Sequence, residues 1–119
     1  MNGIVDVTIK GEVYSLKFGM QAIASLEERT TKGGLLITST EGYSKFLSDL
    51  LYCGLLGNSI RKDIAIIPYD ESMDLFEILS MQDDAADQYA KMTKCYFDSI
   101  ADIRAKKEEL ADTDKKKVK

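Results

Sequence analysis

The chain of 119 residues contains no histidine. Histidine is the side chain that most often serves as a general base and as a metal ligand, and every Ser-His-Asp or Cys-His arrangement requires it. The absence of histidine therefore argues against most classes of enzyme. We expect a protein that is not an enzyme and that has no cofactor and no bound metal.

Cysteine is scarce, and targeting signals are missing. Cys53 and Cys95 lie among apolar residues at helical spacing, as reduced core cysteines do. A disulfide would need their helices to pack side by side, and a reducing compartment disfavours it. The start Met1-Asn2-Gly3 lacks the regions of a signal peptide, and no apolar run approaches the ~18 residues of a membrane span. We expect a cytoplasmic protein without membrane contact.

The charge balance is acidic, with a formal net charge of −4 and a pI near 4.8. This argues against general affinity for nucleic acid or an anionic membrane. Hydrophobic residues make up 45% of the chain, which predicts a folded core, and the length fits one domain. We expect a single domain over residues 1–111 and a disordered, lysine-rich tail over residues 112–119.

The first twenty residues predict a β-hairpin that leads directly into a helix. Apolar and polar residues alternate on both sides of a turn at Lys10-Gly11-Glu12, and Gly19 ends the alternation. The apolar positions are Val5, Val7, Ile9, Tyr14, Leu16 and Phe18. A lone hairpin is marginally stable, so the helix after it should cover its apolar face.

Helical spacing recurs along the rest of the chain. The first predicted helix follows Gly19 and places Met20, Ile23 and Leu26 inward, and the second runs from a Thr38/Glu41 capping box to Gly57-Asn58. The third extends from an Asp70 N-cap to Ser80, with Met73, Phe76 and Leu79 on its inward face. The last follows Asp83-Asp84 for about 28 residues, with a stripe of Ala86, Tyr89, Thr93, Tyr96, Ile100 and Ile103. Periodicity does not decide whether Ile64–Ile67 is a strand or a connector, and we take it as a buried connector. We expect an α+β fold that is mainly helical. In it, an N-terminal hairpin packs on a bundle of about four helices, of which the last is long.

Residues 63–88 contain acidic side chains but no lysine or arginine. Two functional interpretations are a divalent-cation site and a docking surface for a basic partner. The acidic residues fall on the outer faces and caps of two predicted helices, without EF-hand spacing. We therefore favour a solvated face, with the docking surface as the next alternative.

Two features favour binding over catalysis. The last helix is longer than a core of this size can cover, so part of it should project or pack on another subunit. Leu35, Leu36 and Ile37 form an apolar patch beside the glycine loop Gly33-Gly34. Together they indicate self-association or partner binding. The expected partner-binding residues are Leu35, Leu36, Ile37, Met73, Phe76 and Tyr89.

The segment IKGEVYSLKFGM, residues 9–20, resembles the start of the tail assembly chaperones of long-tailed (siphovirus-like) bacteriophages and prophages. The order of the later elements is also similar. It comprises a helix beginning MQAIASLEE, a glycine-containing loop, a second helix ending near Tyr52-Cys53-Gly54-Leu55, a short helix, a long helix and a charged tail.

The resemblance implies a non-enzymatic, mainly helical protein of the bacterial host cytoplasm. Such a protein binds the tape measure protein, keeps it soluble and helps to recruit tail tube subunits, and the family has no catalytic residues. The alternative is a DNA-associated regulatory protein with a helix-turn-helix-like core. The acidic stretch from Asp70 to Asp87 opposes that alternative, because a recognition helix is basic where it meets phosphate.

Overall fold

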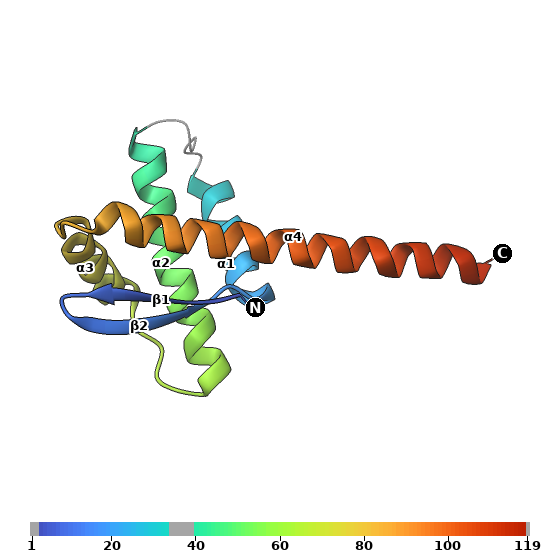
Figure 1. The fold of residues 1–119 in the computed structure, drawn as a ribbon, viewed down its shortest axis with the longest axis horizontal. Coiled ribbons are helices and arrows are strands. Elements are labelled where there is room, and N and C mark those ends of the chain that lie inside the picture. The colour runs from blue at the N-terminus through green and yellow to red at the C-terminus, as the bar shows by residue number, and fades with distance from the viewer. Residues whose placement is uncertain (1–2, 34–39, 119) are drawn as a thin grey trace.

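The structure is a computed structural model that describes residues 3–33 and 40–118, with side chains placed at 3–29, 44–103 and 105. A two-stranded antiparallel hairpin at the N-terminus is followed by four helices, of which the last is the longest (Figure 1). The fold is α+β and mainly helical, as predicted.

The hairpin consists of β1 (Ile4–Ile9) and β2 (Glu12–Lys17), with Ile9 opposite Glu12 and Val5 opposite Leu16. Lys10 and Gly11 connect them with φ angles of 53° and 79°. Two successive positive φ values define a type I′ turn, whose twist matches that of the strands. The predicted apolar face is confirmed, since its residues are buried or half-buried: Val5, Val7, Ile9, Tyr14, Leu16 and Phe18.

Helix α1 (Met20–Gly33) packs through Ala22, Ile23 and Leu26, all of which are buried. The prediction that Met20 faces inward is wrong, because its side chain is 58% exposed. Met20 is the first helical residue, and the helix turns its next apolar positions, Ala22 and Ile23, toward the core. The three-residue spacing therefore holds from Ile23 to Leu26 only.

Helix α2 (Thr40–Lys62) is the central element and contacts β2, α1, α3 and α4. It does not end at Gly57-Asn58, and the prediction there is wrong. Gly57 lies inside the helix, at a point where β2 passes very close. A Cβ at this position would lie 2.2 Å from the Lys17 carbonyl oxygen. This glycine serves close packing rather than a helix end. Thr38, the expected cap, lies outside the described residues.

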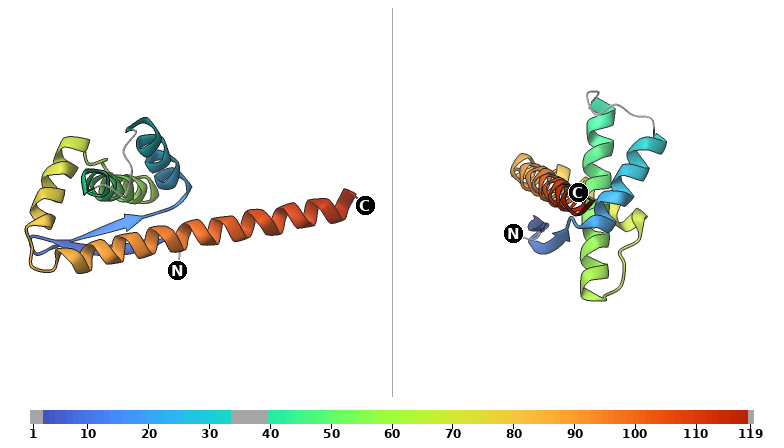
Figure 2. Two further views of the ribbon diagram at one scale, coloured as in Figure 1. Left: turned by 90° about the horizontal axis from the view of Figure 1, so that it is seen from above. Right: turned by 90° about the vertical axis from the view of Figure 1, so that its right-hand side faces the viewer.

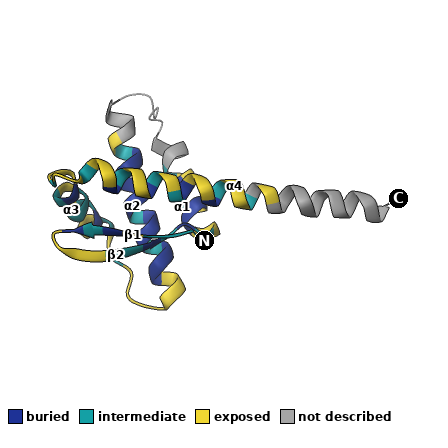
Figure 3. Cartoon of the chain, viewed as in Figure 1, coloured by how far each residue is buried: buried dark blue, intermediate teal, exposed yellow. Residues whose placement is uncertain are grey.

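The segment between α2 and α3 is an irregular connector, and its expected burial is wrong. Ile64 and Ile66 are both exposed, and only Ile67 packs against the core (Figure 3). The backbone N–H of Ile64 donates to the Ser59 carbonyl, and the Ser59 hydroxyl donates to the Ala65 carbonyl, so the connector folds back along the last turn of α2. These bonds fix the backbone while the isoleucine side chains point to solvent.

Helix α3 (Tyr69–Ser80) begins two residues earlier than predicted. Its N-cap is Pro68 rather than Asp70, which lies in the first turn beside Glu71. Proline ahead of a helix supplies a fixed φ and has no N–H to satisfy, and the two carboxylates suit the positive end of the helix dipole. Leu79 is fully buried, and Met73 and Phe76 are half-buried.

Helix α4 (Ala85–Val118) has 34 residues and projects beyond the body of the molecule (Figure 1). Its described contacts with the core extend to Ile103. The helix continues through residues 112–118, where the sequence favours a disordered tail. The expected stripe is confirmed at Tyr89, Tyr96, Ile100 and Ile103, which are buried or pack against the core. It is wrong at Ala86, which is exposed, and it lacks Met92, which is fully buried.

The core lies where the hairpin meets α2 and α4. β2 packs on α2 and β1 packs on α4, so the hairpin lies between these two helices (Figure 2). Phe18 and Tyr96 meet edge to face with ring centroids 5.9 Å apart, and Phe46 meets Tyr96 at the same distance. Such aromatic pairs add about 0.5–1.5 kcal/mol each to the area that they bury.

Glutamine side chains cover the outer edge of β1. Gln88 accepts from the Thr8 N–H, whereas Gln82 accepts from the Lys10 N–H and donates to the Thr8 carbonyl. Both amides also donate to Asp84, which orients them. These bonds lower the pKa of the Asp84 carboxyl, the one to Gln88 most. An exposed strand edge is a site of unwanted pairing, and this arrangement covers it.

Candidate partner-binding surface

The structure brings together part of the surface that the sequence indicates. The rings of Phe76 on α3 and Tyr89 on α4 stack with centroids 5.9 Å apart and an interplanar angle of 27°. The Tyr89 hydroxyl donates to the Ser80 hydroxyl oxygen. Met73 lies one helical turn before Phe76 on the same side of α3. Leu35, Leu36 and Ile37 lie outside the described residues.

Phe76 and Tyr89 are half-buried and pack against the core, so only part of each ring faces solvent. Their stacking joins α3 to the first turns of α4. The two rings therefore contribute to the fold as well as to any surface that they present.

Apolar surface is exposed at other places that the sequence analysis did not select. Among the side chains that the structure describes, seven large apolar ones are exposed: Val13, Met20, Ile60, Ile64, Ile66, Met81 and Phe97. Single exposed apolar residues are ordinary, but neighbouring ones indicate an interaction site. Met20 and Ile60 are neighbours, since they line the same hollow.

That hollow has a volume of about 280 Å³ and lies between the start of α1 and the end of α2. Its lining includes Gly19, Gly57 and Ala22, together with Lys17 and Arg61. Sequence reasoning missed it because Gly57 was taken as a helix end. The small residues at 19, 22 and 57, followed by the basic pair Arg61-Lys62, are the signal that was available.

A larger hollow of about 450 Å³ lies between β1 and α4. Gly3, Ile4 and Val5 form one side of it, and Lys91, Lys94, Cys95, Asp98, Ser99, Ala101 and Asp102 form the other. Lys94 pairs with Asp98 at 2.8 Å on the surface of α4. This hollow is lined by both signs of charge, so it selects neither an anionic nor a cationic partner.

A polar cluster joins α1, α2 and α3. The fully buried Asp49 accepts from the Lys45 ammonium at 2.8 and 3.1 Å and from the Tyr69 hydroxyl at 3.1 Å. The bond to Asp49 raises the pKa of Lys45. The Arg29 guanidinium carbon lies 4.6 Å from the ring centroids of both Tyr52 and Tyr69. Every charge here has a partner within the fold, which identifies a structural junction.

The described residues contain no group of three or more His, Cys, Asp or Glu side chains that could hold a metal ion. Both cysteines are free thiols, and burial raises the pKa of each, which suppresses the reactive thiolate. The acidic residues of α3 and of the turn after it are exposed, in agreement with a solvated face: Asp70, Glu71, Asp74, Glu77, Asp83 and Asp84.

In the described part of the chain, no helix combines the length and the apolar character needed to cross a membrane. Comparisons of the chain with protein-family models, with curated proteins and with solved structures find no match. The fold and the surface define a small α+β protein, mainly helical, with exposed apolar residues and a projecting helix.

Proposed function

We propose that this chain is a tail assembly chaperone of a long-tailed bacteriophage or prophage. In this role it binds the tape measure protein in the bacterial cytoplasm, keeps it soluble and helps to recruit tail tube subunits, and it catalyses no reaction. The observation that carries the proposal is the apolar surface left exposed on a body whose core is already filled. A long amphipathic client needs its apolar stripe covered, and such a surface covers it.

Two further observations support the proposal. The hairpin, the following helices and the long last helix occur in the order that the sequence resemblance implies. The projecting part of α4 suits self-association, which would present several copies of the chaperone along one client. The exposed carboxylates of α3 oppose the DNA-associated alternative, since phosphate would repel them.

The test is co-expression of the chain with a tape measure fragment that is insoluble alone, followed by light scattering over a concentration series. We expect a soluble complex, and assemblies larger than the 13.3 kDa chain. Leu36→Asp and Phe76→Ala should reduce recovery of the complex, whereas the control Ala90→Asp, at an exposed position of α4 outside the exposed apolar surface, should not. A strict monomer that leaves the fragment insoluble would contradict the proposal.

A further inference from the structure

We infer that the hollow between α1 and α2 binds an apolar side chain carried by an acidic amphipathic helix of a partner protein. The inference deepens the proposed function. It rests on that function in one respect, because the proposed function identifies the partner as the tape measure protein. It names a different surface from the one that the sequence indicates, and the chemistry that this surface accepts.

The hollow exists because small residues form its floor. Gly57 and Ala22 are buried there, and the approach of the β2 backbone to Gly57 leaves no room for a larger side chain. The walls are the apolar side chains of Met20 and Ile60, which are 58% and 43% exposed. A volume of about 280 Å³ lies below the ~300–1,000 Å³ typical of small-molecule sites. It suits one or two side chains of a partner.

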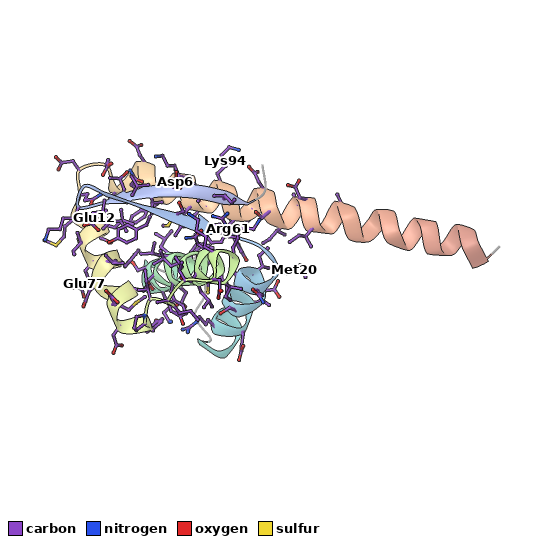
Figure 4. The ribbon with its side chains drawn as sticks, turned by 90° about the horizontal axis from the view of Figure 1, so that it is seen from below. Asp6, Glu12, Met20, Arg61, Glu77 and Lys94 are labelled. Carbon is purple, nitrogen blue, oxygen red and sulfur yellow. The ribbon has the colours of Figure 1, made fainter. Side chains whose placement is uncertain are left out.

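The charge around the hollow is positive. Lys17 and Arg61 line it, and none of the described residues that line it is acidic; next to the lining, the exposed Lys62 is followed by the exposed Asp63, so the positive charge comes from Lys17 and Arg61. This is the reverse of the chain as a whole, whose net charge is −4. Glu12 and Glu77 lie at the end of the body away from Met20 (Figure 4). An apolar floor with a basic rim attracts an apolar side chain whose neighbours are carboxylates.

A helix meets this requirement most simply. Residues three and four apart share one helix face, so a leucine or phenylalanine flanked by glutamates at those spacings presents both groups together. The exposed Ile64 follows Ile60 on the folded-back connector and extends the apolar surface at this end of the molecule. One amphipathic helix laid across the hollow would cover these residues and place its carboxylates near Lys17 and Arg61.

The experiment uses the full chain and two fluorescently labelled helical peptides. Both carry the same leucine stripe, and glutamates flank the stripe in one and lysines in the other. Anisotropy titrations are made at 50 and 300 mM salt, and Ile60→Asp and Arg61→Glu are compared with the control Val13→Asp. Arg61 is exposed, and its guanidinium donates to the Asn58 side-chain oxygen at 2.8 Å, so thermal melts are used to confirm that Arg61→Glu and the other variants fold.

We expect the acidic peptide to bind at least tenfold more tightly than the basic one, with the difference reduced at the higher salt concentration. Ile60→Asp and Arg61→Glu should each weaken binding at least tenfold, and Val13→Asp should leave it unchanged. Equal binding of the two peptides, or unchanged binding by Arg61→Glu, would overturn the inference. Self-association that Ile60→Asp abolishes, without peptide binding, would also overturn it, since the hollow would then hold another copy of this chain.

The two proposals fail in different ways. If Ile60→Asp and Arg61→Glu still rescue the tape measure fragment as well as the unaltered chain, the chaperone function stands and the inference is wrong. If the unaltered chain binds the acidic peptide through the hollow but leaves the fragment insoluble, the binding surface stands and the proposed function is wrong.

Discussion

The close approach of β2 to α2 at Gly57 predicts the effect of adding a single methyl group. In Gly57→Ala, the new Cβ would lie 2.2 Å from the Lys17 carbonyl oxygen and 3.3 Å from the Ala22 Cβ. The helix and the strand must separate by about 1 Å before ordinary contact at 3.4 Å is reached. A backbone oxygen cannot move aside by changing rotamer, so the whole end of β2 must shift.

Two opposing terms set the magnitude. Alanine is favoured over glycine inside a helix by about 1 kcal/mol, whereas overpacking a close contact costs about 1–3 kcal/mol and occasionally more. Because the obstacle is backbone, we expect the upper part of that range and a net decrease in the free energy of unfolding of about 1–2 kcal/mol. Urea unfolding followed by circular dichroism measures it, with Ser44→Ala at an exposed position of α2 as the control. A Gly57→Ala variant as stable as the unaltered chain would refute the reasoning.

Three further predictions concern single polar groups. Asp49→Ala removes a buried carboxylate that holds an ammonium and a hydroxyl, so the free energy of unfolding should fall by about 3 kcal/mol; a urea titration that shows a fall of less than 1 kcal/mol would contradict this estimate. The folded-state pKa of Asp84 lies below its usual 3.8, so the stability that this carboxylate contributes is present above pH 3.8 and is lost as the pH falls through the folded-state pKa. Hydrogen-exchange protection of the Thr8 amide should fall over the same pH range, because Asp84 orients the Gln88 side chain that accepts from this amide. Asp84→Asn should abolish this pH dependence. Burial raises the pKa of Cys53, so iodoacetamide at pH 7 should leave it unmodified until the protein is denatured, and equal rates in the two states would show that the thiol is accessible.

The sequence predicted the hairpin and the inward face of α3 because each depends on local spacing. Alternation placed Val7 and Leu16 on one face, and helical spacing placed Leu79 inward; all three are fully buried. A two-residue turn and a three-residue recurrence are properties of neighbouring residues, and no distant contact is needed to set them.

The errors arose where a distant contact decides the outcome. Glycine is typical of a helix end, yet Gly57 lies inside α2, where the Lys17 carbonyl, forty positions earlier in the chain, leaves no room for a Cβ. Ile64 and Ile66 are apolar, yet they are exposed because backbone bonds to α2 fix the connector. Neither cause is visible in a local window of sequence.

Two of the candidate partner-binding residues lie together in the fold, whereas their role in binding stays a prediction. The residues selected on α3 and α4, Phe76 and Tyr89, do meet, because their helices are joined by a short turn. The hollow beside Met20 was missed because its residues come from three separate elements and only the fold brings them together. A hollow built from several elements depends on tertiary packing, whereas the apolar stripe of one helix can be predicted from the spacing of its residues alone.

The glutamine bonds along β1 have a consequence for the order in which the chain folds. They join Thr8 to residues 74 and 80 positions further on, so a strand that is synthesised earlier is completed by side chains that are synthesised much later. Domains emerge from the ribosome N-terminus first, and a two-stranded hairpin alone is marginally stable. The hairpin can pack on α2 earlier, but it acquires these edge partners only after Gln88 has emerged, when closure of a loop over most of the chain brings α4 against β1.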